Sequence, residues 1–148
     1  MKSKLMSGTS EPRIYVVVLE EGEEAFRTLT DFVRSEKLTA ASLTAIGAFE
    51  HAVVGWFDLA RKTYKRISVS EQCEVLSAIG DVAVDDQGRS SLHIHAVLGL
   101  EDGGTRGGHL IEGKVRPTLE VIFTETRATI RRKKRDDLGI ALIDLSAN

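Results

Sequence analysis

Short apolar runs separated by charged or glycine-containing breaks occupy most of the chain and predict a protein built mainly from β-strands. The first run, 14–19, is continuous and rich in β-branched residues, which is typical of a buried strand. Turn-forming residues at 85–88, 101–104 and 136–139 separate later runs. We expect further strands at 42–49, 52–57, 65–69, 75–84, 92–100, 107–112, 119–131 and 140–145.

One segment has the spacing of a helix instead. Apolar residues recur from Ala25 to Val33 with charged residues between them, which predicts an amphipathic helix of about 14 residues. The acidic residues before it suit the first turn, where they meet the positive end of the helix dipole. Many strands and one helix predict an α+β fold: a single domain with a mostly antiparallel β-sheet packed by one main amphipathic helix.

Composition narrows the class of protein. The 148 residues suit one domain, and we expect a disordered N-terminal tail at 1–12 followed by a domain at 13–148. The net charge of −2 argues against a dedicated nucleic-acid binder. The single cysteine, Cys73, cannot form an intrachain disulfide and is expected to be buried. No apolar run approaches the ~20 residues of a membrane span and no signal peptide is evident, so a cytoplasmic location is expected.

Three of the four histidines lie close together in the sequence. His93 and His95 are two residues apart in a predicted strand, so both project from one face. If the following loop is 101–103, Leu100 pairs with Gly104 and His95 lies opposite His109. A two-residue loop would send His109 to the other face, unless a bulge at 107–108 restored it.

Neutral imidazoles are good ligands for zinc and similar ions, so this pattern favours a metal site. Three histidines with one open position are typical of catalytic rather than structural zinc sites. The alternative is that the histidines are half-buried strand residues that hydrogen-bond to neighbours or line a subunit interface.

Seven segments, in order, resemble the PPC domain (plants and prokaryotes conserved). They are 16–23, 45–49, 54–58, 73–77, 92–98, 107–113 and 118–121. The resemblance implies an α+β domain, a homotrimer, and a divalent metal, expected to be zinc, held by His93, His95 and His109. The family fold is also similar to that of acetolactate decarboxylase, a zinc enzyme. The DNA-binding label of the family comes from plant proteins that carry AT-hooks, and residues 113–117 do not supply such a hook.

Other polar residues are candidates for a functional role. The basic run at 131–135 could contact phosphates or an acidic partner, although a solvated strand edge is its commoner meaning. Glu120 and Glu74 are carboxylates among apolar strand residues, where each could be an acid or base, a partner of a histidine, or part of an interface. His51 is expected at the surface.

The sequence therefore supports three hypotheses. The first is a trimeric protein that binds a divalent metal and has a ligand-binding or regulatory role. The second is a metal-dependent lyase or hydrolase in which Glu120 assists. The third is a DNA-binding or protein-interaction module that uses the basic run.

Overall fold

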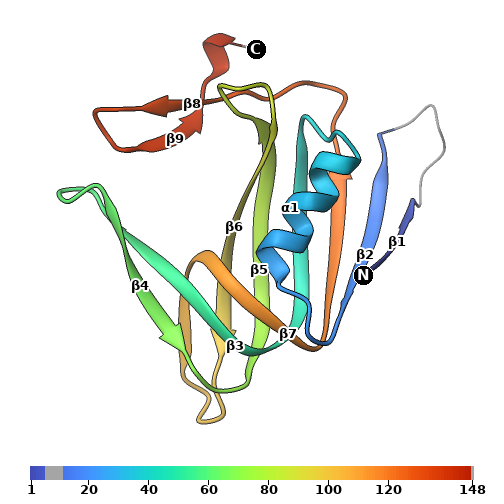
Figure 1. Cartoon of the computed structure of the whole chain (residues 1–148), viewed down its shortest axis with the longest axis vertical. Helices are drawn as coiled ribbons and strands as arrows, with labels where there is room; N and C mark the ends of the chain where they lie inside the picture. Colours follow the sequence, from blue (N-terminus) through green and yellow to red (C-terminus); the bar gives the residue numbers. More distant parts are fainter. Residues whose placement is uncertain (6–11, 148) are drawn as a thin grey trace.

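A computed structural model describes residues 1–5 and 12–147 (Figure 1). One α-helix lies among the strands of this part of the chain, and a short 3-10 helix ends it. The elements are β1 Lys2–Leu5, β2 Ile14–Glu20, α1 Ala25–Ser35, β3 Ala41–Asp58, β4 Thr63–Val69, β5 Cys73–Val84, β6 Ser90–Gly99, β7 Thr105–Glu125, β8 Arg132–Arg135, β9 Ile140–Ile143 and η1 Leu145–Ala147. The predicted fold class, a mostly antiparallel sheet with a single helix, is confirmed.

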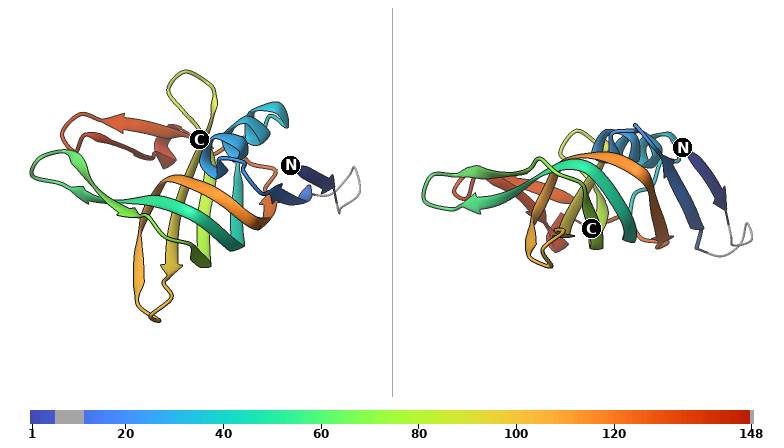
Figure 2. Two further views of the ribbon diagram at one scale, coloured as in Figure 1. Left: turned by 60° about the horizontal axis from the view of Figure 1, so that its bottom comes forward. Right: turned by 90° about the horizontal axis from the view of Figure 1, so that it is seen from below.

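The large sheet has seven strands in the order β1-β2-β7-β6-β5-β3-β4, and all of its pairings are antiparallel. The long strand β7 pairs with β6 near its start and with β3 along most of its length, while β5 joins β6 to β3. These four strands therefore form a closed circuit, and the views in Figure 2 show how strongly β3 and β7 bend to complete it. Two hairpins project on the same side of β6 in Figure 1. One, called the arm, is formed by β4 and residues 52–58 of β3, and the other is the C-terminal hairpin β8–β9.

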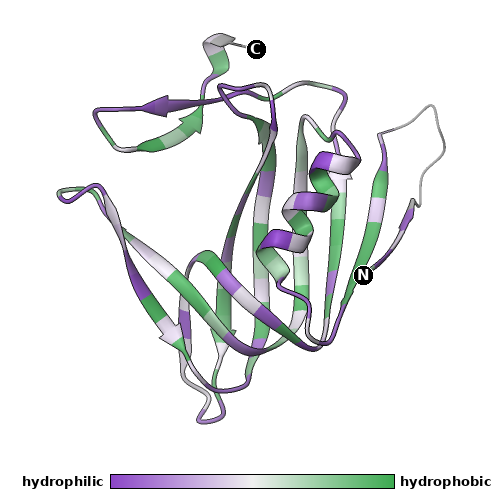
Figure 3. Ribbon diagram, viewed as in Figure 1, coloured by the Kyte–Doolittle hydropathy of each residue, from purple (hydrophilic) through white to green (hydrophobic). Residues whose placement is uncertain are grey.

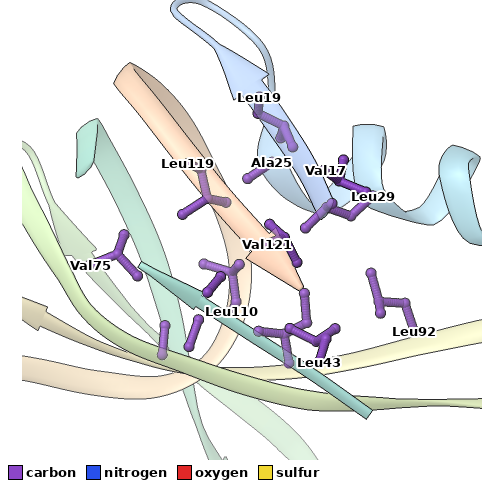
Figure 4. Close-up of a cluster of buried hydrophobic side chains, with 14 of the residues drawn as sticks. Val17, Leu19, Ala25, Leu29, Leu43, Val75, Leu92, Leu110, Leu119 and Val121 are labelled. Atoms are coloured by element: carbon purple, nitrogen blue, oxygen red, sulfur yellow. The ribbon is translucent and has the colours of Figure 1, made fainter. Parts of the chain in front are cut away.

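The core follows from the alternation of residue types along the strands, which Figure 3 shows as alternating colours. In β6, Leu92, Ile94, Ala96 and Leu98 are buried, whereas the residues between them are not. Side chains of α1, including Leu29, belong to the same buried cluster as residues of β2, β3 and β7 (Figure 4). Burial of such side chains stabilises the fold by roughly 1.5–3 kcal/mol each.

Several predicted boundaries are wrong. The predicted disordered tail at 1–12 includes Lys2–Leu5, which form β1 on the edge of the sheet, while residues 6–11 lie outside the described residues. The strands predicted at 42–49 and 52–57 are one bent strand, and so are 107–112 and most of 119–131. Helix α1 has 11 residues rather than about 14, because Glu24 caps it from outside by accepting bonds from the amides of Phe26 and Arg27.

Candidate metal centre

The β6–β7 hairpin has the register that the histidine hypothesis required. Leu100 N–H donates to the Gly104 carbonyl over 2.9 Å, and Gly103 at φ +78° supplies the left-handed conformation of the loop. His95 therefore pairs directly with His109. The three-residue loop and the register predicted from it are confirmed, and all three histidines share one face.

A ring nitrogen from each of the three histidines lies within 4.8 Å of the others. His93 Nε2 and His95 Nε2 are 3.1 Å apart, and the rings of His93 and His109 stack with centroids 5.1 Å apart. His95 is exposed, whereas the other two are half-buried. His109 Nδ1 is buried and has no hydrogen-bond partner among the described residues. A buried polar atom without a partner is costly, so this nitrogen is suited to a ligand that the protein itself does not supply.

Glycine at position 108 allows the close approach that places His109. Strand β3 crosses here, with Gly55 paired with His109. A Cβ on Gly108 would lie 2.5 Å from the Gly55 carbonyl oxygen, and the φ of +156° is itself unusual for other residues. Position 108 therefore requires glycine. This steric requirement explains why a glycine precedes His109 in the Gly-Gly-His segment.

Burial and neighbouring charges favour the neutral form of His95 and His109. Burial, followed by the charges of His93, His95 and Arg132, lowers the pKa of His109 to about 4. Burial and the neighbouring His93 also lower the pKa of His95. Neutral imidazole is the form that binds a metal ion, so the geometry and the protonation state agree.

Asp81 on β5 contacts the Nδ1 side of the His93 ring. It pairs with His93 across the strands, and its Oδ2 lies 3.5 Å from His93 Nδ1. Its other oxygen accepts a hydrogen bond from Arg132, which is only 7% exposed. Although burial opposes ionisation of Asp81, the contact with His93 and the charge of Arg132 outweigh it and lower its pKa. Asp81 is therefore a carboxylate that can orient His93 and leave its Nε2 free.

A pocket of about 640 Å³ opens beside the histidines. The arm β3–β4 contributes Trp56, Phe57 and Tyr64 to it, and the Tyr64 ring stacks on His109 with centroids 5.0 Å apart. Arg132 and residues 139–142 of the C-terminal hairpin form another wall. Both hairpins flank β6 on the same side in Figure 1.

The two candidate carboxylates are not brought to the histidines. Glu120 is exposed and lines a separate hollow with Ile46 and Ile122. Glu74 is exposed near the start of β5 and lines another hollow. Neither lines the pocket beside the histidines, so the geometry of this subunit does not support the role in catalysis predicted for Glu120.

The remaining candidates have structural explanations. In the basic run, Arg132 pairs with Asp81, Lys134 with Asp136, and Arg135 with Asp137. His51 is half-buried in β3, and Cys73 is buried as expected.

Comparison with known proteins is decisive for the family. Residues 6–127 match the Plants and Prokaryotes Conserved (PCC) domain, also abbreviated PPC. The chain belongs to this family. A PPC protein from Pyrococcus horikoshii has 31% identity and a TM-score of 0.81, covering 97% of this chain and 94% of its own.

Two further solved structures share the fold of this chain. A metal-containing protein from Archaeoglobus fulgidus has 28% identity and a TM-score of 0.79, covering 97% of this chain and 99% of its own. A candidate DNA-binding protein from Bacteroides thetaiotaomicron has 22% identity and a TM-score of 0.87, covering 97% and 98%. At this identity the second likeness shows the fold alone.

The more distant structures resemble this chain in fold only. Acetolactate decarboxylase from Bacillus subtilis has 14% identity and a TM-score of 0.58, covering 86% of this PPC chain and 58% of its own. A search of the curated proteins finds no match. Within the described residues, no helix has the length and apolar character needed to cross a membrane.

The sequence analysis missed Asp81 and Tyr64, and it did not connect Arg132 of the basic run with the histidines. A signal for Asp81 was present, because the turn at 85–88 fixes the β5–β6 register, and counting back from it sets Asp81 opposite His93. Arg132 and Tyr64 carry no such signal, since they reach the site from hairpins that no local register relates to β6.

Proposed function

We propose that this PPC-domain protein binds one divalent metal ion per subunit through His93, His95 and His109, and has a ligand-binding or regulatory role. The observation that carries the proposal is the convergence of three imidazoles, each of which places one ring nitrogen within 4.8 Å of the others, while His109 Nδ1 is buried without a partner in the described chain. The metal-containing relative from Archaeoglobus fulgidus supports it independently.

The donor set favours zinc. Three neutral imidazoles suit zinc and its neighbours in the transition series, whereas magnesium and calcium prefer oxygen ligands. Tetrahedral zinc with bonds of about 2.0–2.1 Å holds its ligand nitrogens roughly 3.3 Å apart. The 3.1 Å between His93 Nε2 and His95 Nε2 is close to this separation.

Three neighbouring residues hold the metal-binding histidines in position. Asp81 Oδ2, 3.5 Å from His93 Nδ1, is placed to accept a hydrogen bond from its N–H and so leave Nε2 free for the metal, while Arg132 keeps Asp81 ionised and in place. Tyr64 stacks on His109 and fixes its ring. A bound metal would supply a Lewis acid at the edge of the pocket.

The proposed assembly is a homotrimer, as in the family. Apolar side chains are exposed on the sheet face that carries the histidines. Thr44 pairs with both Ile79 and Ile122, and Ile79 pairs with His95, so these residues share that face. Ile79 is 59% exposed and Ile122 is 47% exposed. Exposed apolar patches of this kind are typical of subunit contacts.

A metal-dependent enzyme, a lyase or hydrolase, is the second candidate. The pocket beside the histidines favours it, because three protein ligands leave a coordination position that a substrate or water can occupy. Catalysis with Glu120 as the assisting carboxylate would require the residue to come from another subunit, since it lies outside the pocket of its own.

The deciding experiment measures metal content and zinc affinity of the purified full chain. We expect one zinc per subunit in the wild type and nearly none in His93→Ala and His109→Ala. His51→Ala is the matched control, because it removes the fourth histidine and leaves the cluster intact. Metal content that is low in the wild type, or unchanged in both cluster variants, would overturn the proposal.

A further inference from the structure

The pocket beside the histidines has walls that a metal site alone does not need. Trp56, Phe57 and Tyr64 form one side, and Ile140, Ala141 and Leu142 form the other. Trp56 is 59% exposed and Leu142 is 40% exposed, so large apolar side chains face solvent at the rim. A ligand that covers them would gain hydrophobic free energy in proportion to the apolar area it buries.

The only permanent charge among the described residues that line the pocket is a cation, which the carboxylate of Asp81 offsets in part from outside the lining. Arg132 is the single lining residue with a permanent charge, and no carboxylate lines the pocket in the described part of the chain. Arg132 Nη2 is bound to Asp81, but Nη1 has only a 3.4 Å contact with Ser91 Oγ, longer than an ordinary hydrogen bond. This N–H remains suited to a better acceptor. A metal ion on the histidines would add further positive charge close by.

We infer that this pocket binds a small monocarboxylate with an apolar or aromatic body. The inference rests on the proposed metal function. The carboxylate would lie at the metal and Arg132, and the body would lie between Trp56 and Leu142. A polyanion such as a phosphate ester finds one lining cation, and a sugar finds few hydrogen-bonding side chains on the apolar walls.

The C-terminal hairpin is the specificity element in this arrangement. It lies beyond residues 6–127, which match the family domain, and it contributes both Arg132 and Leu142 to the pocket. A change at Leu142 can therefore alter the ligand without touching Arg132, which also holds Asp81 beside His93.

The test uses phenylacetate as the probe on zinc-loaded full-length protein. Trp56 is the only tryptophan, so its fluorescence reports on the pocket, and calorimetry gives affinities. Acetate keeps the carboxylate without the body, and 2-phenylacetamide keeps the body without the charge. We expect phenylacetate to bind with saturation and at least about tenfold more tightly than either, since each lost contact costs roughly 1.4 kcal/mol or more. Equal affinity for either analogue, or no saturable binding, would overturn the inference.

Variants locate the binding site. Leu142→Ala removes part of the wall and should weaken phenylacetate binding about fivefold. Leu145→Ala is the matched control, because Leu145 is 80% exposed and does not line the pocket. Equal losses in both variants, or none in Leu142→Ala, would contradict the placement.

Metal content separates the two proposals. A wild type without stoichiometric zinc refutes the proposed function. A zinc-loaded protein that does not bind phenylacetate refutes only the proposal of a monocarboxylate ligand. Cobalt in place of zinc gives a second readout: phenylacetate should change its visible absorption, and phenylacetamide should not. Phenylacetate binding that persists in His93→Ala would show that the metal does not hold the carboxylate and would overturn the inference.

Discussion

The histidine cluster and the basic run at 131–135 are the two groups of polar residues that stand out in the sequence, and their electrostatic surroundings differ. The histidines face one another, and His109 Nδ1 is buried without a partner among the described residues. In the basic run, the exposed cations Lys134 and Arg135 pair with Asp136 and Asp137, whereas Arg132 is buried and lines the pocket beside the histidines. A functional site is indicated where the fold concentrates groups that it leaves unpaired, whereas paired charges already have a structural explanation.

Adding zinc should produce the largest effect, and only the histidine cluster should respond. A ligand that binds only the folded state stabilises it by about 4 kcal/mol at 1,000 times its Kd. We expect zinc to raise the urea midpoint of the wild type and chelation to reverse the change. The midpoint of His93→Ala should not respond to zinc, and an equal rise in that variant would place the zinc elsewhere.

Gly108→Ala should damage the site through the backbone. The new Cβ would collide with the Gly55 carbonyl, and the φ of +156° adds strain, so we expect a loss of about 2–4 kcal/mol in unfolding free energy. Gly88→Ala is the control, since Gly88 has φ +76° and open space around its Cβ position. Its loss should be smaller, and its zinc affinity should equal that of the wild type. Equal stability of the two variants would contradict the steric argument.

Asp81→Asn tests the carboxylate behind His93. The amide cannot fix the His93 tautomer as a carboxylate does, so zinc affinity should fall about 10–100-fold. Glu120→Gln makes the same chemical change outside the pocket and should leave zinc affinity unaltered. If Glu120→Gln weakens zinc binding and Asp81→Asn does not, the roles assigned to the two carboxylates are reversed.

The same contrast shows how far sequence alone reaches. The face shared by the three histidines was predictable, because a three-residue loop with glycine at 103 fixes the hairpin register. The pairing of Arg132 with Asp81 was not, since 50 residues separate them and only the packing of the C-terminal hairpin brings them together. The bends that merge four predicted strands into β3 and β7 also escaped prediction, because they arise where one strand changes partners.

The metal-free protein should lose stability in acid through His109. Its pKa is about 4 in the folded state against an ordinary value of 6.5. Between these values the unfolded chain takes up a proton that the folded chain does not, so the stability present above pH 6.5 declines as the pH falls toward 4. Urea unfolding at pH 7 and pH 5 should show a smaller decline in His109→Gln. An equal decline in both proteins would show that His109 is not the titrating group.

Neutralising the exposed cations of the basic run should have the smallest effect. Exposed pairs such as Lys134–Asp136 contribute little, so a triple variant with Lys133→Gln, Lys134→Gln and Arg135→Gln should change unfolding free energy by no more than about 0.5 kcal/mol. Zinc binding should not change, because none of the three residues lines the pocket.

The variant also tests the DNA hypothesis, since phosphate contacts make binding fall steeply with salt. Binding to duplex DNA that is steeply salt-dependent in the wild type and lost in the variant would show that paired cations can still form an interface, and the contrast between the two groups would fail.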